Sequence, residues 1–455
     1  MEADLAPSFW LATCGDDLSP RPALSGDAEA DVCIVGAGYT GLWTAYHLAR
    51  LDPSMRVAVV EANIAGWGAS GRNGGWCSAL FAASWPRLAQ EHGADAALAL
   101  RHAMEQTVDD VGDWSREHGV DIGYVKGGTL TFARSAAQMQ RLGHHAQEDQ
   151  RFGGSDTVLL SADEAVRRVR VTDSHDAMFT PHCAAIQPAK LARGLARVVE
   201  QLGVTVYEQT AAVAIEPHVV RTQHGSVRAE FVIRATEGYT VSLAEHQRTV
   251  APVWSLLIVT EPLPDQVWAD IGWDGHETVT DERHVLIYAQ HTSDGRIAFG
   301  GRGAPYRFGS RTDGTRGHAA TYRRLEKAFA EMFPAAQHVP IARRWGGVLA
   351  VPRDWMPSVG LDATTGYGWG GGYVGDGVAC AALAGRTLAD LVLKRDTDAT
   401  TLPWVQHHSR RWEPEPLRWL GIRGVSVALE AADGEERRFG RPSRIAAAAG
   451  KLLGG

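Results

Sequence analysis

The sequence predicts an α/β protein in which a Rossmann-like dinucleotide-binding domain is joined to a second domain built on an antiparallel sheet. Two observations predict this fold class. Residues 31–61 read as a strand, a glycine-rich turn, a helix and a second strand, which is typical of a nucleotide-binding βαβ unit. Residues 252–302 alternate apolar and polar positions between turn residues such as Asp294 and Gly295, which is typical of antiparallel hairpins. With 455 residues, the chain is long enough for two domains that share one site.

The nucleotide-binding unit begins with the apolar strand 32–35. Gly36, Gly38 and Gly41 then have the G-x-G-x-x-G spacing, in which the glycines permit a tight turn, approach of a pyrophosphate and close helix packing. Glu61 ends the next strand, where a carboxylate accepts hydrogen bonds from a ribose hydroxyl and disfavours the 2′-phosphate of NADP. An ordinary α/β turn is the weaker alternative, because the strand, the helix and the acid are all in place.

Two further glycine-rich blocks follow the unit. Residues 65–75 are too rich in glycine for a helix interior and include Ser70, Arg72 and Asn73. Such a loop can donate backbone N–H groups to a flat, partly anionic ligand. Residues 370–378 lead into a helix expected over 379–393, whose N-terminus presents free N–H groups and a positive dipole end. The blocks together indicate one ligand that is touched several times.

The paired motifs resemble a known family. The G-x-G-x-x-G unit followed by GWGASGRNGG at residues 66–75 is similar to the FAD-dependent D-amino-acid oxidase (DAO) superfamily, whose nucleotide domain is of the GR2 type. The most similar branch holds γ-glutamylputrescine oxidase-like and aminophosphonate oxidoreductase-like members. The resemblance covers about residues 31–393. It implies FAD as the cofactor, with residues 66–75 along the isoalloxazine ring and the helix after residue 378 aimed at the flavin.

The resemblance also assigns cofactor contacts to individual residues. Val213 would meet the adenine through its backbone, and Ala235 and Thr236 match the family's A-T-G segment, although Glu237 precedes Gly238 here and its role stays open. The predicted cofactor-binding residues are Gly36, Gly38, Tyr39, Thr40, Gly41, Glu61, Ala62, Gly68, Ala69, Ser70, Arg72, Asn73, Gly74, Gly75, Val213, Thr236, Gly372, Gly375, Asp376, Gly377 and Val378.

For activity, the resemblance implies oxidation of the CH–NH bond of a small amine or amino-acid-like substrate. Hydride would pass from the carbon beside a neutral amine to flavin N5, water would hydrolyse the imine to an aldehyde or keto product, and O2 would reoxidise the flavin to give H2O2. An apolar aromatic wall favours the neutral amine, and the candidates for it are Trp67, Trp76, Tyr288, Trp345, Trp355 and Tyr373. Arg302 can fork onto a distal acidic group. The predicted catalytic residues are therefore Tyr288, Arg302, Trp345 and Tyr373.

Three departures from sarcosine-oxidising relatives refine this expectation. Those relatives attach FAD through a cysteine in the stretch that matches residues 344–354, and this chain has none there, so non-covalent FAD is expected at that point. They also carry lysines where Ala298 and Ala379 stand. The first absence puts fast oxygen activation in doubt, and the second favours a larger amine with a distal acidic group over a short α-amino acid.

Alternative functions remain open at this point. The chain can be a dehydrogenase of the same fold that passes electrons to an acceptor other than O2, or a flavin-binding protein without turnover. An NAD-dependent dehydrogenase is less consistent with the sequence, because the second and third glycine-rich blocks would then have no purpose.

The segments between the motifs predict the remaining organisation. Ser161 and Glu164 have the spacing of a helix-capping box. Helices are predicted over residues 86–119, 134–150, 191–202 and 316–333, and strands over 124–132, 204–207, 211–215 and 231–236. The FAD-binding domain is expected to comprise 31–90, 151–245 and 340–395, the substrate domain 91–150 and 246–339, a surface arm 1–30, and a helical extension 396–455 to which no chemistry is assigned.

Composition limits the partners and the compartment. The net charge of −8 disfavours nucleic acid and anionic membranes as partners. The acidic N-terminus lacks the pattern of a signal peptide, and the sequence contains no apolar run long enough to span a bilayer. Five scattered cysteines suggest neither a zinc site nor a disulfide framework. A cytoplasmic protein without a metal site is expected, and the oligomeric state stays open.

Overall fold

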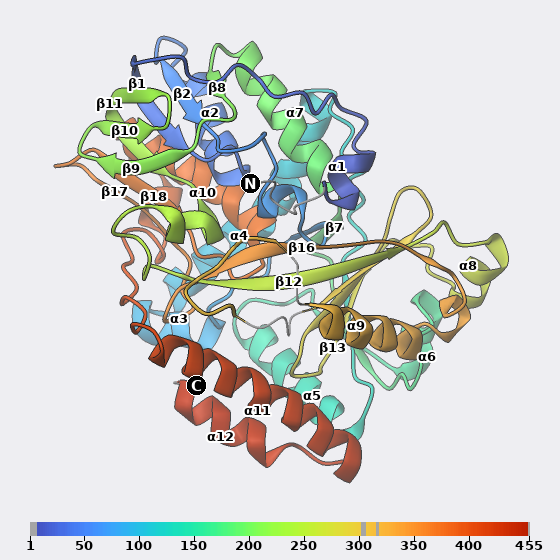
Figure 1. The fold of residues 1–455 in the computed structure, drawn as a ribbon. Helices are drawn as coiled ribbons and strands as arrows, with labels where there is room; N and C mark the ends of the chain where they lie inside the picture. Colours follow the sequence, from blue (N-terminus) through green and yellow to red (C-terminus); the bar gives the residue numbers. More distant parts are fainter. Residues whose placement is uncertain (1–6, 302–305, 315–317, 454–455) are drawn as a thin grey trace.

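The computed structural model describes residues 7–301, 306–314 and 318–453, which are arranged around two large sheets (Figure 1). Within these residues, the first sheet has eight strands in the order β17-β18-β11-β1-β2-β8, with β10 and β9 attached at β11. Its strands are β1 (Ala28–Val35), β2 (Val57–Val60), β8 (Thr205–Tyr207), β9 (Ala212–Glu216), β10 (Val219–Thr222), β11 (Gly225–Arg234), β17 (Ser358–Asp362) and β18 (Tyr367–Gly371).

The centre of the first sheet is parallel, as a Rossmann-like domain requires. β1 pairs in parallel with β11 and with β2, and its residues 32–34 are fully buried because helices cover the sheet. The helices of this domain are α2 (Tyr39–Leu51), α3 (Trp85–His92), α4 (Ala94–Glu117), α7 (Pro188–Gln201) and α10 (Gly377–Val392). The predicted α/β class with a Rossmann-like domain is confirmed.

The second sheet is mostly antiparallel and extends across the lower right of Figure 1. In the described part of the chain its order is β16-β12-β15-β14-β13-β4-β6-β5. The strands are β4 (Thr129–Phe132), β5 (Val158–Leu160), β6 (Ala177–Thr180), β12 (Ala251–Thr260), β13 (Thr278–Asp281), β14 (Ile287–His291), β15 (Ile297–Gly301) and β16 (Ile341–Val351). The accompanying helices are α5 (Ala136–Arg151), α6 (Ala162–Arg168), α8 (Asp265–Ile271) and α9 (Ala319–Met332). The predicted capping box forms at the start of α6, between Ser161 and Glu164.

Several short elements lie outside the two large sheets. β3 (Trp76–Ser78) pairs with β7 (Cys183–Ala185) in a two-stranded ribbon. The 3-10 turns are η1 (Ala69–Gly71), η2 (Glu237–Ser242), η3 (Pro334–Ala336) and η4 (Asp398–Thr401).

Sheet membership differs from the predicted domain boundaries. β5, β6 and β16 pair within the second sheet, although residues 151–245 and 340–395 were assigned to the FAD-binding domain. β16 pairs with β12 over its whole length, from Ala251 opposite Val351 to Thr260 opposite Ile341. Conversely, α4 lies within residues 91–150 but packs its apolar side chains into the core of the first domain. The domain to which each of these elements belongs is determined by strand pairing and helix packing between residues far apart in the sequence. Motif spacing along the chain does not predict such contacts.

The N-terminal segment is also more deeply placed than a surface arm. Its short helix α1 (Phe9–Thr13) begins at Ser8, whose hydroxyl caps the backbone N–H of Leu11. Phe9, Trp10 and Leu11 are buried and belong to a cluster that includes Trp345. The reason is the apolar triplet Phe-Trp-Leu, which removes a large area from water when it is buried.

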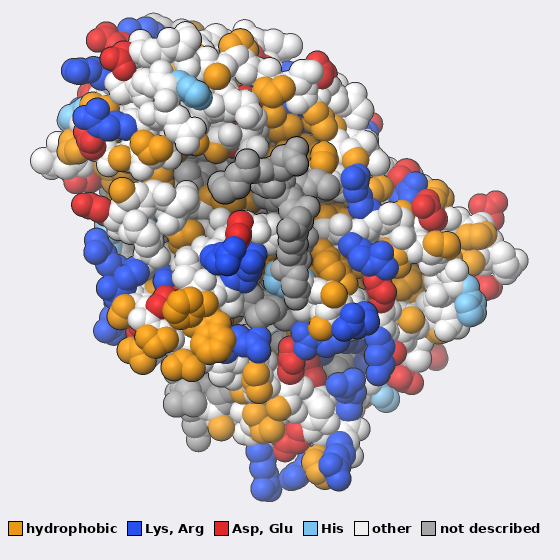
Figure 2. Space-filling view, in the orientation of Figure 1, with side chains coloured by type: hydrophobic (Ala, Val, Ile, Leu, Met, Phe, Trp, Pro, Cys, Tyr) orange, Lys and Arg blue, Asp and Glu red, His pale blue; other side chains and the backbone are white. Residues whose placement is uncertain are grey.

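The C-terminal helices α11 (Leu417–Phe439) and α12 (Arg444–Leu453) pack on each other along the lower edge of the molecule (Figure 1). Hydrophobic side chains gather over the start of α11 at the lower left of Figure 2, where Leu417 and Leu420 are exposed. In the part of the chain that the structure describes, no helix combines the length and hydrophobicity needed to cross a bilayer.

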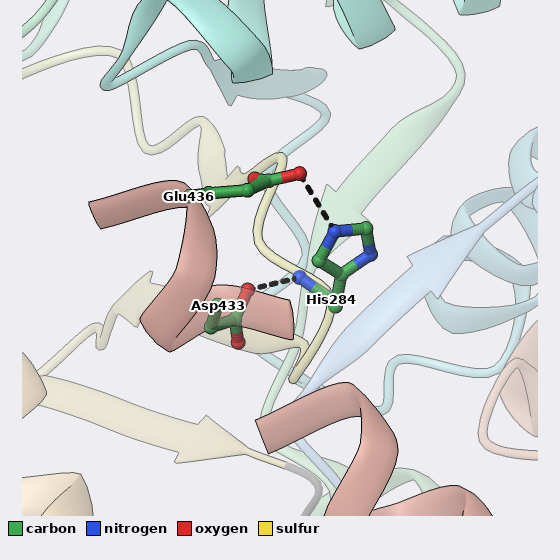
Figure 3. Close-up of side chains that lie close together, drawn as sticks. All are labelled: His284, Asp433 and Glu436. Carbon is green, nitrogen blue, oxygen red and sulfur yellow. Dashed lines mark hydrogen bonds and ion pairs between the residues drawn. The ribbon is translucent and has the colours of Figure 1, made fainter. Parts of the chain in front are cut away.

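A polar cluster fastens α11 to the turn between β13 and β14 (Figure 3). Nε2 of His284 donates to Glu436 over 2.9 Å, and Asp433 accepts from the backbone N–H groups of His284 and Val285. Arg141 donates to both carboxylate oxygens of Glu436 at 3.0 Å each. Burial acts to raise the pKa of Glu436, but the hydrogen bonds from Arg141 and His284 outweigh it and lower the pKa to about 2. Although the three groups lie close enough to hold a metal ion, these contacts account for the cluster as a joint between helix and hairpin.

Candidate active site

A cavity that is partly open to solvent lies where the two sheets meet the glycine-rich segments. Segments that are far apart in the sequence line it together: the turn after β1, the loop at residues 67–73, the end of β11 and the start of α10. The predicted cofactor-binding residues that line it are Gly36, Gly38, Tyr39, Thr40, Glu61, Ala62, Gly68, Ala69, Ser70, Asn73, Thr236, Gly375, Gly377 and Val378. The three predicted glycine-rich blocks therefore meet at one cavity.

The turn after β1 has room for backbone but not for side chains. Gly36 has a φ of +109°, and a Cβ there would lie 2.6 Å from the carbonyl oxygen of Ala235. A Cβ at Gly41 would overlap the carbonyl oxygen of Gly36. Gly38 forms the N-cap of α2 without a side-chain cap, and the Ser70 hydroxyl accepts from the N–H of Tyr39 over 2.8 Å. Gly38, Tyr39 and Thr40 line the cavity, so the N-terminus of α2 lies in its wall, and a helix N-terminus favours a bound anion.

Glu61 closes the turn from the neighbouring strand. Its carboxylate accepts from the N–H of Ala37 at 2.8 Å and from that of Asn63 at 2.9 Å. Burial raises the pKa of Glu61, and these backbone hydrogen bonds offset part of the rise. The backbone N–H groups of Ala37 and Asn63 therefore fix the orientation of the Glu61 carboxylate. Glu61 lines the cavity, where we predict that it contacts a ribose.

The second glycine-rich loop is held by its own side chains. Arg72 is buried, donates from Nε to the carbonyl oxygen of Trp67 over 2.8 Å, and lies over the Trp67 ring. Burial lowers the pKa of the Arg72 guanidinium. Asn73 donates to the carbonyl oxygens of Ala69 and Ser70. Asn73 and Ser70 line the cavity, whereas Arg72 shapes the loop from behind.

Helix α1 and strand β16 support the same loop from the outside. The Ser8 hydroxyl donates to the carbonyl oxygen of Gly71 over 2.5 Å, and Nε1 of Trp10 donates to that of Asn73 over 2.8 Å. Nε1 of Trp345 donates to the carbonyl oxygen of Arg72 over 3.0 Å. Sequence reasoning missed this role of α1, and the available signal was a capping serine followed by three large apolar residues.

The third block places a tyrosine hydroxyl beside the first. Tyr373 and Thr40 share a hydrogen bond of 2.8 Å between their hydroxyl groups. Burial, with the neighbouring Glu237, raises the pKa of Tyr373 far above its ordinary value, so the phenol keeps its proton. The start of α10 at Gly377 adds a second helix N-terminus to the cavity wall.

The remaining predicted residues lie around the cavity in different ways. Tyr288 shares a hydrogen bond of 2.8 Å with Ser255, and its ring packs so close to Gly74 that a Cβ there would lie 2.6 Å from it. Trp345 is 3% exposed and packs against Phe9 and Trp10, behind the loop. Arg302 lies outside the described residues.

The other predicted cofactor residues flank the lining. Gly41, Gly74, Gly75, Gly372 and Asp376 belong to the same turns as lining residues. Val213 is 44% exposed on β9, while its neighbour Ala212 lines the cavity. Lining residues that sequence reasoning did not assign to the cofactor include Asn63, Tyr239, Leu243, Leu349 and Glu237. Of these, Glu237 carried a signal, because it interrupts the A-T-G pattern.

Comparison with known proteins identifies the cofactor that fits this cavity. Residues 31–391 match the family model of FAD dependent oxidoreductases, DAO. The chain belongs to this family. FAD is therefore its cofactor, and the glycine cradle, the two helix N-termini and the acid at Glu61 fit the diphosphate and ribose of that molecule.

Several relatives match over most of their length. The gamma-glutamylputrescine oxidoreductase of Escherichia coli (strain K12) is 31% identical over 391 residues, which are 85% of this chain and 88% of that protein. The probable oxidoreductase OrdL of Rhizobium meliloti (strain 1021) is 30% identical over 88% of this chain and 92% of its own. The crystal structure of glycine oxidase from Geobacillus kaustophilus has a TM-score of 0.70 at 23% identity, covering 84% of this chain and 99% of that one. This structural likeness confirms the DAO fold.

Proposed function

We propose that this protein oxidises the CH–NH bond of a small amine that carries an acidic group at its far end, with O2 as the electron acceptor. The observation that supports this most is the composition of the cofactor cavity. Besides the glycine-rich blocks, its wall carries the apolar and aromatic side chains of Trp67, Leu349 and Tyr373. An ammonium is costly to desolvate beside such a wall, so the wall favours the neutral amine, whose lone pair can assist oxidation of the adjacent carbon.

The relatives support the substrate class. A relative that matches over most of its length is by name a gamma-glutamylputrescine oxidoreductase, which points to an amine whose distal end is acidic. Arg302 remains our predicted partner for that acidic group, since a guanidinium can hold a carboxylate with two parallel hydrogen bonds.

Bound FAD supplies the electron-accepting chemistry. The protein contributes placement and electrostatics. The N-termini of α2 and α10 stabilise negative charge in the cavity. Tyr373 shapes the wall rather than acting as a base, because its phenol stays protonated and is engaged with Thr40. Water then hydrolyses the imine to an aldehyde or keto product, and reoxidation by O2 gives H2O2.

The test is anaerobic mixing of purified, FAD-loaded protein with a panel of polyamines, γ-glutamylamines, aminophosphonates and N-methyl amino acids. We expect loss of the oxidised flavin absorbance with an amine that bears a distal acid, and release of H2O2 when air is admitted. Removal of the distal acid should raise KM more than it lowers kcat. No bleaching with any amine would refute the proposal and favour flavin binding without turnover.

A dehydrogenase of the same fold is the second candidate. Ala298 favours it, because sarcosine-oxidising relatives carry a lysine at the matching position and alanine offers no cation there. Bleaching by an amine without H2O2 under air, together with reduction of an artificial acceptor, would favour the dehydrogenase.

A further inference from the structure

Glu237 occupies a position in the cavity wall that neither the family motif nor the proposed reaction explains. It follows β11 and opens η2, with a φ of +42°. This backbone conformation is uncommon for a residue other than glycine, and such residues concentrate at functional sites. The side chain lies in the wall of the same cavity as Gly36, Thr236 and Gly375.

The Glu237 carboxylate joins three parts of the fold. One oxygen accepts from the N–H of Gly372 over 2.8 Å, and the other accepts from the N–H of Ala350 over 3.2 Å. Gly371 permits this approach, since a Cβ there would lie 2.9 Å from the carboxylate. One side chain thus links the end of β11, strand β16 of the second sheet and the turn that leads into α10. That turn also carries the cavity residues Tyr373 and Gly375.

The surroundings of Glu237 hold its pKa near neutral pH, so that its charged and neutral forms are close in free energy. Arg234 faces it from β11, Tyr373 from the turn and Cys380 from α10, while residues 348–351 of β16 carry no ionisable side chain. Burial raises the pKa of Glu237 to about 7, although the backbone hydrogen bonds and Arg234 act to lower it. Near neutral pH a small change in the charge of the cavity therefore changes the protonation of this group.

We propose that Glu237 is a positioning residue that takes up a proton when the FAD in this cavity is reduced, and so couples proton binding to the two-electron reduction. The reason is electrostatic: added negative charge in the cavity raises the proton affinity of a carboxylate in its wall. In this step two electrons enter the cofactor from the reductant, and one proton from water binds a carboxylate oxygen of Glu237, whose charge changes from −1 to 0. No covalent bond to the protein forms.

The inference rests on FAD binding and not on the proposed amine, because a chemical reductant serves equally well. The test is the equilibrium midpoint potential of the FAD-loaded protein, titrated with dithionite between about pH 5 and about pH 9, on both sides of the Glu237 pKa. Wild type is compared with Glu237→Gln, which keeps the shape of the side chain and cannot take up the proton. The matched control is Glu277→Gln, a buried carboxyl that is 6% exposed, has a raised pKa and lies just before β13.

Between about pH 7 and about pH 9, where the oxidised protein holds Glu237 mostly ionised, we expect the potential of wild type and of Glu277→Gln to fall more steeply with pH than that of Glu237→Gln, by up to one additional proton per two electrons. Equal slopes in wild type and Glu237→Gln would overturn the proposal and leave Glu237 a purely structural link. Should Glu237→Gln fail to fold or to retain FAD, the infrared difference spectrum of wild type upon reduction decides. A protonated-carboxyl band must appear, and its absence would equally overturn the proposal.

Discussion

Trp10 provides a direct measure of how much α1 contributes to the cofactor loop. The substitution Trp10→Phe removes the indole N–H that donates to the carbonyl oxygen of Asn73 over 2.8 Å and retains an aromatic ring at a site that is 1% exposed. This hydrogen bond is partly buried, and a partly buried carbonyl that loses its partner costs about 1–2 kcal/mol. The smaller ring adds about 1 kcal/mol for lost packing.

Trp254→Phe is the matched control. Trp254 is fully buried, and among the described residues its indole N–H has no hydrogen-bond partner. The two substitutions remove the same atoms, so the difference between them isolates the hydrogen bond to Asn73. We expect Trp10→Phe to lower the free energy of unfolding by about 1–2 kcal/mol more than Trp254→Phe.

The assay combines urea unfolding of the FAD-free protein with FAD titration followed by flavin fluorescence. Because Asn73 lines the cavity, a displaced loop should also weaken FAD binding, and each 1.4 kcal/mol corresponds to about a tenfold change in Kd. Equal unfolding free energies and equal FAD affinities in the two variants would refute the idea that α1 holds the loop.

Three further predictions follow from the same geometry. Gly41→Ala should abolish FAD retention, because its Cβ would overlap the Gly36 carbonyl oxygen, and the flavin absorbance of the purified protein checks this. The control Gly143→Ala places its Cβ in open space on a helix and should stabilise the protein by up to about 1 kcal/mol in thermal unfolding. Glu436→Gln should destabilise the protein by about 3 kcal/mol at neutral pH. The pKa of Glu436 in the folded state is about 2, below the ordinary 4.5. In urea unfolding, the difference in unfolding free energy between wild type and Glu436→Gln should therefore shrink as the pH falls from 4.5 to about 2. The pKa of Glu237 is instead raised from 4.5 to about 7. FAD-free wild type should therefore lose up to about 3 kcal/mol of unfolding free energy relative to Glu237→Gln as the pH rises from 4.5 to about 7. Parallel pH profiles of thermal unfolding for the two proteins would contradict this prediction.

The cofactor cradle could be predicted from the sequence because its requirements are local. Gly36 and Gly41 are glycines since a Cβ at either position would meet backbone atoms a few ångströms away, and such steric demands leave a fixed spacing in the chain. The capping box at Ser161 is local in the same sense.

The parts that escaped prediction depend on distant partners. Residues 340–395 are predicted to belong to the FAD-binding domain, and Gly347 does face Arg72 of the loop, but the backbone of residues 344–347 is hydrogen-bonded to β12 in the second sheet. A sequence motif alone does not distinguish a segment that contacts the FAD-binding domain from a segment that belongs to it. The burial of α1 likewise depends on Trp345 and Asn73, neither of which lies near it in the sequence.

The alternation of the chain between its two sheets has a consequence for dissection of the protein. The nucleotide sheet begins with β1 and gains β17 and β18 only after the second sheet has received its last strand, β16. A fragment that ends before β18 therefore lacks both the edge of the nucleotide sheet and the N-terminus of α10, while a fragment that begins after β2 lacks its centre. We therefore expect neither half to bind FAD on its own.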